Sequence, residues 1–194
     1  PELLSREVSA ALLPVVDAAL ADEQAARASL EAAIGVALVR LGEQSAVTGL
    51  PLSAYACTLV GAMARGDRAW LFHVGDGVAV AVAADGGQTV SPPENGEYAN
   101  ETFFATSPQW REHLRLTPCP TAPVQLVLMS DGSMPFAMDR GNAGLFAGFM
   151  QPVVRHLAAA DEQAGSAALR ATLDDPRTHA ITNDDKTLLI ALRA

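Results

Sequence analysis

Three acidic turns, each joined to an apolar run typical of a β-strand, constrain the fold of this sequence more than any other feature. They lie in segments 72–77 (FHVGDG), 124–132 (VQLVLMSDG) and 183–191 (NDDKTLLIA). A carboxylate at the end of a buried strand is held rigidly, and several strand ends can converge on one point. Because hard divalent cations such as Mg²⁺ and Mn²⁺ prefer oxygen ligands, these turns are candidates for a metal site. A single Asp-Gly pair is usually only a turn, so the hypothesis depends on all three.

The composition fits one globular domain over residues 1–194. Hydrophobic residues make up 49% of the chain and charged residues 18%, which allows a substantial core. The net charge of -9 argues against a nucleic-acid groove and disfavours an anionic membrane surface. The two cysteines, Cys57 and Cys119, form no Cys-x-x-Cys pair, and two such thiols suit a reducing compartment. We therefore expect a cytoplasmic protein that binds neither nucleic acid nor membrane.

Helical periodicity dominates the first 43 residues, where apolar side chains recur at intervals of three and four from Leu4 and again from Leu30. Asp22 is suited to cap the second of these helices. Two further helices are predicted over 144–157 and 161–173. The apolar face of the first is formed by Phe146, Met150, Val153 and Leu157.

Strand-like segments fill the middle of the chain and its last residues. The predicted strands are 57–64, 69–74, 78–83, 88–90, 102–106, 111–116, 124–129 and 186–192. Asp85-Gly86-Gly87, between two of them, is a strong hairpin signal. A helix pair, a group of strands, a second helix pair and a last strand suggest two antiparallel sheets flanked by helices.

Four segments, in this order and spacing, resemble one known family. Segments 56–60 (ACTLV) with 75–77 (GDG), 128–132 (LMSDG) and 183–188 (NDDKTL) resemble the metal-dependent protein phosphatases of the PP2C (PPM) type. Segment 95–104 (NGEYANETFF) is similar to a small bacterial branch of that family. The resemblance covers the chain from Ser53 to the C-terminus. It implies an α+β fold, the PP2C-like α-β-β-α sandwich of two antiparallel sheets flanked by helices.

The resemblance also implies a function. Members of the family hydrolyse phosphoserine or phosphothreonine on proteins, through a binuclear Mg²⁺ or Mn²⁺ site and a metal-activated water. The expected partners are phosphorylated protein substrates and a cognate Ser/Thr kinase.

Asp131 is the best single candidate for a metal ligand. It follows an apolar strand, Gly132 permits a tight turn, and the matching Asp of the family binds metal. The last acidic turn supplies a second candidate. Aligning Thr187 with the family's Thr puts Asp184 on the metal-binding Asp and Asp185 on the usual Asn. Asp184 is therefore favoured, and Asp185 stays open as the alternative.

Asp76 matches an Asp that holds a third, weaker metal in relatives. In that pattern another Asp lies four residues after the aspartate of the Asp-Gly pair, and here that position is Pro135. A structural role for Asp76 is therefore as well supported as a metal-binding one. Asp85 is interpreted as a hairpin turn only.

The remaining polar residues of interest favour ordinary structural roles. Thr58 suits packing or a bond to the backbone, and His73 a place in the core or at a sheet edge. Surface positions are expected for His113, His156 and His179. No chemical role is assigned to Glu97, Asn100 and Glu101.

The sequence departs from the family at its N-terminal side. The family carries an Arg, a Glu-Asp pair and an Asp-Gly, whose Asp bridges both metals, on strands before its first helices. No Asp-Gly precedes Ser53 in this sequence. We therefore expect a domain that lacks the N-terminal strands, and little turnover by residues 1–194 alone. The alternative is a non-catalytic PP2C-like binding or regulatory module with an incomplete metal site.

Overall fold

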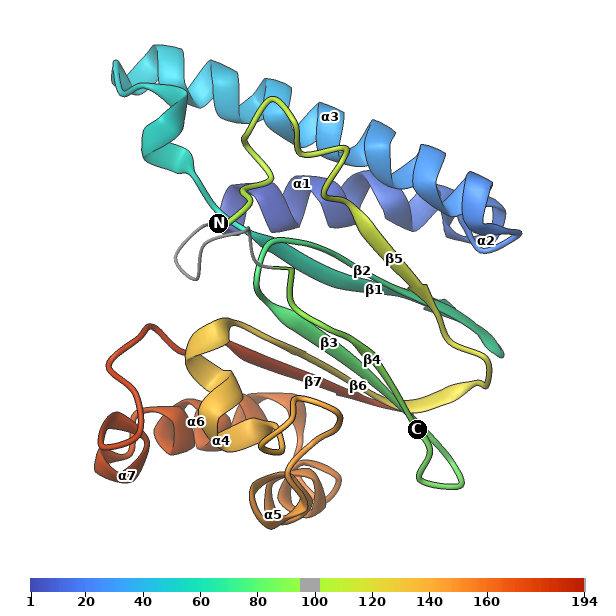
Figure 1. Cartoon of the computed structure of the whole chain (residues 1–194), viewed down its shortest axis with the longest axis vertical. Coiled ribbons are helices and arrows are strands. Elements are labelled where there is room, and N and C mark those ends of the chain that lie inside the picture. The colour runs from blue at the N-terminus through green and yellow to red at the C-terminus, as the bar shows by residue number, and fades with distance from the viewer. Residues whose placement is uncertain (95–101, 194) are drawn as a thin grey trace.

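Two β-sheets stacked face to face, with helices on both outer sides, form the architecture seen in Figure 1. The computed structural model describes residues 1–94 and 102–193. The predicted α+β sandwich of two antiparallel sheets flanked by helices is confirmed. Glu97, Asn100 and Glu101 lie outside the described residues.

The first helical layer consists of α1 (Glu2–Leu12), the 3₁₀ turn η1 (Leu13–Val15), α2 (Val16–Ala19) and α3 (Glu23–Thr48). Asp22 caps α3 as predicted, because its carboxylate accepts a hydrogen bond from the Ala25 N–H at 2.8 Å. The helix continues past residue 43 to Thr48, and its C-cap is Gly49, whose positive φ of 70° suits a residue without a Cβ.

The first sheet has the strand order β1-β2-β5, and the helical layer covers its outer face. Its strands are β1 (Leu59–Arg65), β2 (Arg68–Val74) and β5 (Arg115–Pro118), and the 3₁₀ turn η2 (Leu52–Tyr55) leads into β1. The predicted strand over 102–106 is wrong, since the chain turns there instead. The Ser107 N–H donates to the Phe104 carbonyl at 3.0 Å, and Pro108 follows. The strand predicted over 111–116 is shifted toward Pro118 for a similar reason, because residues 111–113 form a turn.

The second sheet has the strand order β4-β3-β6-β7. Its strands are β3 (Val78–Ala83), β4 (Gln88–Ser91), β6 (Pro123–Met129) and β7 (Leu188–Leu192). The hairpin between β3 and β4 is confirmed, with the Asp85 carboxylate accepting from the Gly87 N–H at 2.9 Å. The last strand begins two residues later than predicted, because Thr187 bonds to Ser130 rather than continuing the ladder.

Apolar side chains fill the space between the sheets, with Leu71, Ala79 and Ala81 buried at its centre. His73 is also buried, as predicted, and its Nδ1 lies 2.8 Å from the Ser91 Oγ. Burial lowers the pKa of His73, and the nearby Arg115 acts in the same direction while Glu94 opposes it. The histidine is therefore neutral near pH 7.

The second helical layer covers the outer face of the second sheet (Figure 1). It contains α4 (Met134–Ala137), α5 (Ala147–Leu157), α6 (Glu162–Leu173) and α7 (Pro176–His179). The helix predicted over 144–157 begins at Ala147 instead. Phe146 is the residue before it and is half exposed, so its predicted place on the apolar face of the helix is wrong. Among the helices described, none combines the length and the apolar character needed to cross a bilayer.

Candidate metal centre

The three acidic turns lie at the same end of the second sheet. In the sheet register, Val78 pairs with Met129 and Met129 pairs with Leu188. The start of β3, the end of β6 and the start of β7 are therefore neighbours. Asp76 precedes β3, Asp131 follows β6, and Asp184 precedes β7. The topology thus brings the predicted turns to one edge of the molecule.

The turns at Asp131 and Asp184 are in direct contact. A Cβ built on Gly132 would collide with the backbone carbonyl of Asp185 and would lie 3.0 Å from the Cβ of Asp184. Only a residue without a side chain permits this approach. Gly132 is therefore required for the contact between the turns.

Three hydrogen bonds fasten these turns together. The Ser130 N–H donates to the Thr187 carbonyl at 3.1 Å, and the Thr187 N–H donates to the Ser130 Oγ at 3.0 Å. The Ser133 hydroxyl donates to the same carbonyl at 3.0 Å. Sequence reasoning missed Ser133 and the role of Ser130. Their only signal was a hydroxyl on either side of Asp131-Gly132.

The Asp131 side chain is oriented by its own turn, the 3₁₀ segment η3 (Asp131–Ser133). Its Oδ1 accepts a hydrogen bond from the Gly132 N–H at 2.8 Å, and the residue is exposed. Asp184 and Asp185 are exposed as well, but they meet η3 differently. Asp184 places its Cβ against Gly132, whereas Asp185 presents its backbone carbonyl, which accepts from the Ser130 hydroxyl at 3.2 Å.

Asp76 is half-buried and already has a partner. Its Oδ2 accepts a hydrogen bond from the Thr102 hydroxyl at 2.8 Å, a contact that sequence reasoning missed. The preceding Gly75 has a φ of 107° and packs closely on Thr58, whose predicted packing role is confirmed. These contacts give Asp76 a structural function in the turn between the two sheets.

The carboxylates at this edge are ligands suited to a hard cation, but they form only part of a ligand set. Magnesium keeps several waters in proteins and is commonly held by one or two carboxylates together with substrate phosphate. Asp131 and Asp184 supply donors of that type from adjoining turns. Within residues 1–94 and 102–193, however, no group of three or more His, Cys, Asp or Glu side chains comes close enough to hold a metal ion. The described residues thus offer part of a ligand set.

A charged cavity of about 600 Å³ opens beside the last acidic turn. Its walls come from α6, α7 and the segment before β7, and they include Asp184 and Asp185. Three basic side chains also line it, namely Arg170, His179 and Lys186. His179 is exposed, as predicted, whereas His113 is half-buried and stacks on Phe103, so its predicted surface position is wrong.

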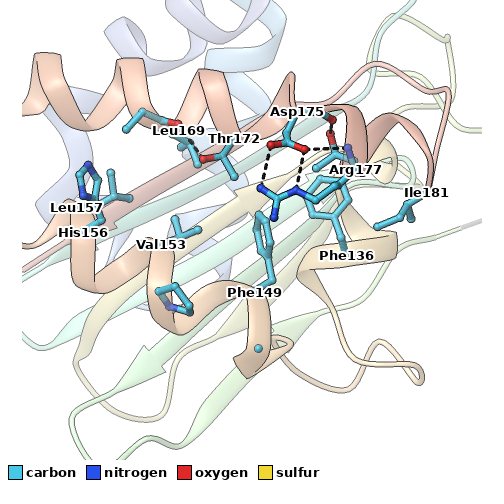
Figure 2. Close-up of a pocket in the computed structure, with 14 residues that line it drawn as sticks. Phe136, Phe149, Val153, His156, Leu157, Leu169, Thr172, Asp175, Arg177 and Ile181 are labelled. Atoms are coloured by element: carbon cyan, nitrogen blue, oxygen red, sulfur yellow. Dashed lines mark hydrogen bonds and ion pairs between the residues drawn. The ribbon is translucent and has the colours of Figure 1, made fainter.

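An apolar cavity of about 440 Å³ lies between α5, α6 and α7 (Figure 2). Phe136, Phe149 and Leu169 are among its lining residues. The Asp175 carboxylate in its wall accepts hydrogen bonds from the Arg177 side chain at 2.9 Å, and these bonds lower the pKa of Asp175 to about 2. Because its carboxylate is already paired, this cavity is a poorer place for a cation than the acidic turns.

Comparison with known proteins agrees with this geometry. The sequence model of the family described as "Protein phosphatase 2C" matches residues 2–174. The chain belongs to the protein phosphatase 2C family. In this PP2C chain the turns of Asp131 and Asp184 adjoin at one end of the second sheet.

Individual relatives of this PP2C chain are phosphatases by name. It is 28% identical over 158 residues to serine/threonine-protein phosphatase 3 of Escherichia coli (strain K12), a match that covers 80% of this chain and 62% of that protein. The chain thus spans less than two thirds of that relative's length.

Solved structures share the PP2C fold. The Mycobacterium tuberculosis serine/threonine phosphatase PstP/Ppp superposes with a TM-score of 0.58 at 18% identity, covering 100% of this chain and 83% of that one. The serine-threonine phosphatase 2C of Toxoplasma gondii gives a TM-score of 0.55 at 11% identity, covering 99% and 81%.

Proposed function

We propose that this PP2C chain is part of the catalytic domain of a protein serine/threonine phosphatase whose Mg²⁺ or Mn²⁺ ions bind at the acidic edge of the second sheet. One observation carries the proposal. In a chain of this family, the turns of Asp131 and Asp184 are packed against each other and joined by hydrogen bonds of Ser130 and Ser133 to Thr187. Rigid placement of two carboxylates is what a metal site needs from its scaffold.

The reaction demands a strong nucleophile and neutralisation of charge, because phosphate monoester hydrolysis is among the slowest uncatalysed reactions. Two bound ions supply both, by lowering the pKa of water and by pairing with phosphate oxygens. Asp131 and Asp184 would hold and orient such ions together with further ligands. The Gly132 N–H fixes one oxygen of Asp131 and leaves the other for a cation.

Asp184 is proposed as the second ligand in preference to Asp185. Its Cβ lies against Gly132 and so on the side of Asp131, whereas Asp185 uses its backbone carbonyl for that contact. Asp76 is proposed to stabilise the turn through Thr102 and to hold no tightly bound ion of its own. Further ligands are needed for two ions, so residues 1–194 alone are expected to hydrolyse phosphoesters slowly.

The substrates are proposed to be proteins phosphorylated on serine or threonine, and the functional partner a cognate Ser/Thr kinase. The names of the relatives support this class of substrate. A cytoplasmic location is proposed from the two free thiols, Cys57 and Cys119. Burial raises the pKa of Cys119 to about 11, so that thiol stays protonated at neutral pH.

A second candidate function is a non-catalytic PP2C-like binding or regulatory module. The observation in its favour is that the described residues do not gather three metal-ligating side chains. A module of this kind would keep the sandwich fold and recognise a partner without turning over phosphoester.

Hydrolysis of p-nitrophenyl phosphate and of a phosphoserine peptide by the intact protein separates the two candidates. The phosphatase proposal predicts turnover with Mn²⁺ and its loss in EDTA. Absence of turnover at saturating Mn²⁺, with the protein shown to be folded by circular dichroism, would favour the non-catalytic module.

A further inference from the structure

The charged cavity beside Asp184 is the strongest unassigned feature of the molecule. It has a volume of about 600 Å³, which lies within the range of about 300–1,000 Å³ typical of ligand pockets. Two of its basic side chains, Arg170 and Lys186, come from different elements. Arg170 lies in the last turn of α6, and Lys186 lies in the segment that leads into β7.

Neither of these cations is neutralised by a carboxylate in the described part of the chain. The ion pairs found there do not include Arg170 or Lys186. The Lys186 ammonium donates instead to uncharged acceptors, the His179 Nδ1 at 3.3 Å and the Asp184 carbonyl at 3.4 Å. Lys186 is also the only lysine in a sequence with a net charge of -9.

His179 links this lysine to the cavity wall. Its Nε2 lies 3.2 Å from the Asp174 carboxylate, so the Nε2–H tautomer donates to Asp174 and leaves Nδ1 to accept from Lys186. The carboxylates of the wall are Asp174, Asp184 and Asp185. Asp174 is occupied by the histidine, Asp184 is the proposed metal ligand, and Asp185 forms no ion pair with Arg170 or Lys186 within the described residues. Both cations therefore remain available to an incoming anion.

We propose that this cavity is a subsite for an anionic side chain of the substrate, one or two residues away from the phosphorylated serine or threonine. The inference rests on the proposed function for the position of the phosphoresidue. An extended peptide advances at most about 3.6 Å per residue, so a neighbouring side chain of a peptide bound at Asp184 is within reach of a cavity that Asp184 itself lines. The anion is a carboxylate or a second phosphate.

A preference for an acidic peptide requires local positive charge, because the protein as a whole repels anions. The long-range field of a protein with a net charge of -9 disfavours binding of an acidic peptide over a neutral one. Tighter binding of the acidic peptide therefore identifies a local cationic site.

The test is fluorescence anisotropy with three labelled phosphoserine peptides and the intact protein in Mn²⁺. One peptide has neutral flanks, one has glutamates next to the phosphoserine, and one has a second phosphoserine. The two anionic arms distinguish a carboxylate from a phosphate as the preferred group. Arg170→Gln and Lys186→Met remove the cations one at a time, from two separate elements.

Arg155→Gln is the matched control. Arg155 is an exposed arginine in the last turn of α5, the counterpart of Arg170 in α6, and it lines a different cavity. The variant removes the same charge from the same kind of position. It thereby separates the effect of a change in net charge from the effect of losing a cation in the subsite.

We expect the wild type to bind at least one anionic peptide about tenfold more tightly than the neutral one, and Arg170→Gln and Lys186→Met each to reduce that preference about fivefold. Arg155→Gln is expected to preserve it. Equal binding of all three peptides by the wild type would overturn the inference, as would an equal loss in Arg155→Gln. Hydrolysis of the same peptides is measured separately, so absence of turnover counts against the proposed function and leaves the binding result to decide the subsite.

Discussion

Two Asp-Gly turns lie at opposite ends of the second sheet and look alike in sequence. Asp131-Gly132 follows β6 at the acidic edge, and Asp85-Gly86 joins β3 to β4 at the other end of β3. In both turns the carboxylate accepts a backbone N–H from a residue just after it, Gly132 at 2.8 Å and Gly87 at 2.9 Å. The local hydrogen bonding therefore does not distinguish the two sites.

The glycines differ in the reason for which they are needed. Gly86 has a φ of 86°, and a Cβ built on it would meet no atom within 4 Å. Gly132 has no positive φ, but a Cβ there would run into the backbone of the Asp184 turn. Gly86 permits the conformation of its own turn, whereas Gly132 permits the contact between two segments that are distant in the sequence. Only the second arrangement brings a second acidic turn into contact.

The largest expected effect on phosphatase activity comes from replacing Asp131 by asparagine, and the same replacement at Asp85 is the control. Asp131→Asn in the intact protein should reduce Mn²⁺-dependent phosphatase activity by more than about 100-fold, because even residues that only orient metal ligands cost about 10–100-fold. Asp85→Asn should stay within about twofold of the wild type, since an Asn oxygen still accepts the turn's hydrogen bond. Steady-state hydrolysis of a phosphoserine peptide measures both. Near wild-type activity in Asp131→Asn would show that this turn is also only structural.

A second pair of substitutions compares Asp184 and Asp185 in the turn that contacts Gly132. Asp184→Ala should lower activity about 100-fold and Asp185→Ala less than about tenfold, because removal of a ligand costs more than removal of an exposed neighbour. The same assay applies, with melting temperatures to confirm folding. The reverse order of effects would mean that Asp185 is the ligand and that the alignment is shifted by one residue.

The sequence supplied much of the fold because its signals are local. The Asp22 cap, the Asp85 hairpin and most strands follow from residues within a few positions of each other. The join between Ser130 and Thr187 could not be predicted, since its partners are 57 residues apart and the hydroxyls have no periodic pattern. The incorrect strand at 102–106 has a similar origin. The Phe103 carbonyl lies against Gly75 and the Ala105 N–H donates to the Cys57 carbonyl at 2.8 Å, and these contacts with distant residues form no ladder.

The third prediction concerns stability and compares the two glycines. Gly132→Ala should lower the free energy of unfolding by about 3 kcal/mol, because a methyl group would force two backbones apart. Gly86→Ala should cost about 1 kcal/mol, the strain of a positive φ alone. Urea unfolding followed by circular dichroism measures both. Gly35→Ala is the control, since this helical glycine has open space at its Cβ. A Gly132→Ala cost no larger than that of Gly86→Ala would contradict the close contact.

The smallest expected effect is a pH dependence of the free energy of unfolding, caused by the buried His73. Burial lowers the pKa of His73, so the unfolded chain takes up a proton at mildly acidic pH before the folded one does. Stability should therefore decline as the pH falls through the pKa of an unfolded histidine, about 6.5. His73→Gln should flatten the dependence of the free energy of unfolding on pH around this value. His156→Gln, at an exposed histidine, should leave that dependence unchanged. Identical profiles for His73→Gln and the wild type would rule out this contribution.

The most direct test of a metal site at the acidic edge is a titration of the intact protein with Mn²⁺, monitored by electron paramagnetic resonance. We expect that the wild type binds Mn²⁺, that Asp131→Asn weakens the affinity by more than about tenfold, and that Asp85→Asn binds as the wild type does. Equal affinity in Asp131→Asn and the wild type, or an equal loss in Asp85→Asn, would contradict the assignment of the metal to the edge where β3, β6 and β7 meet.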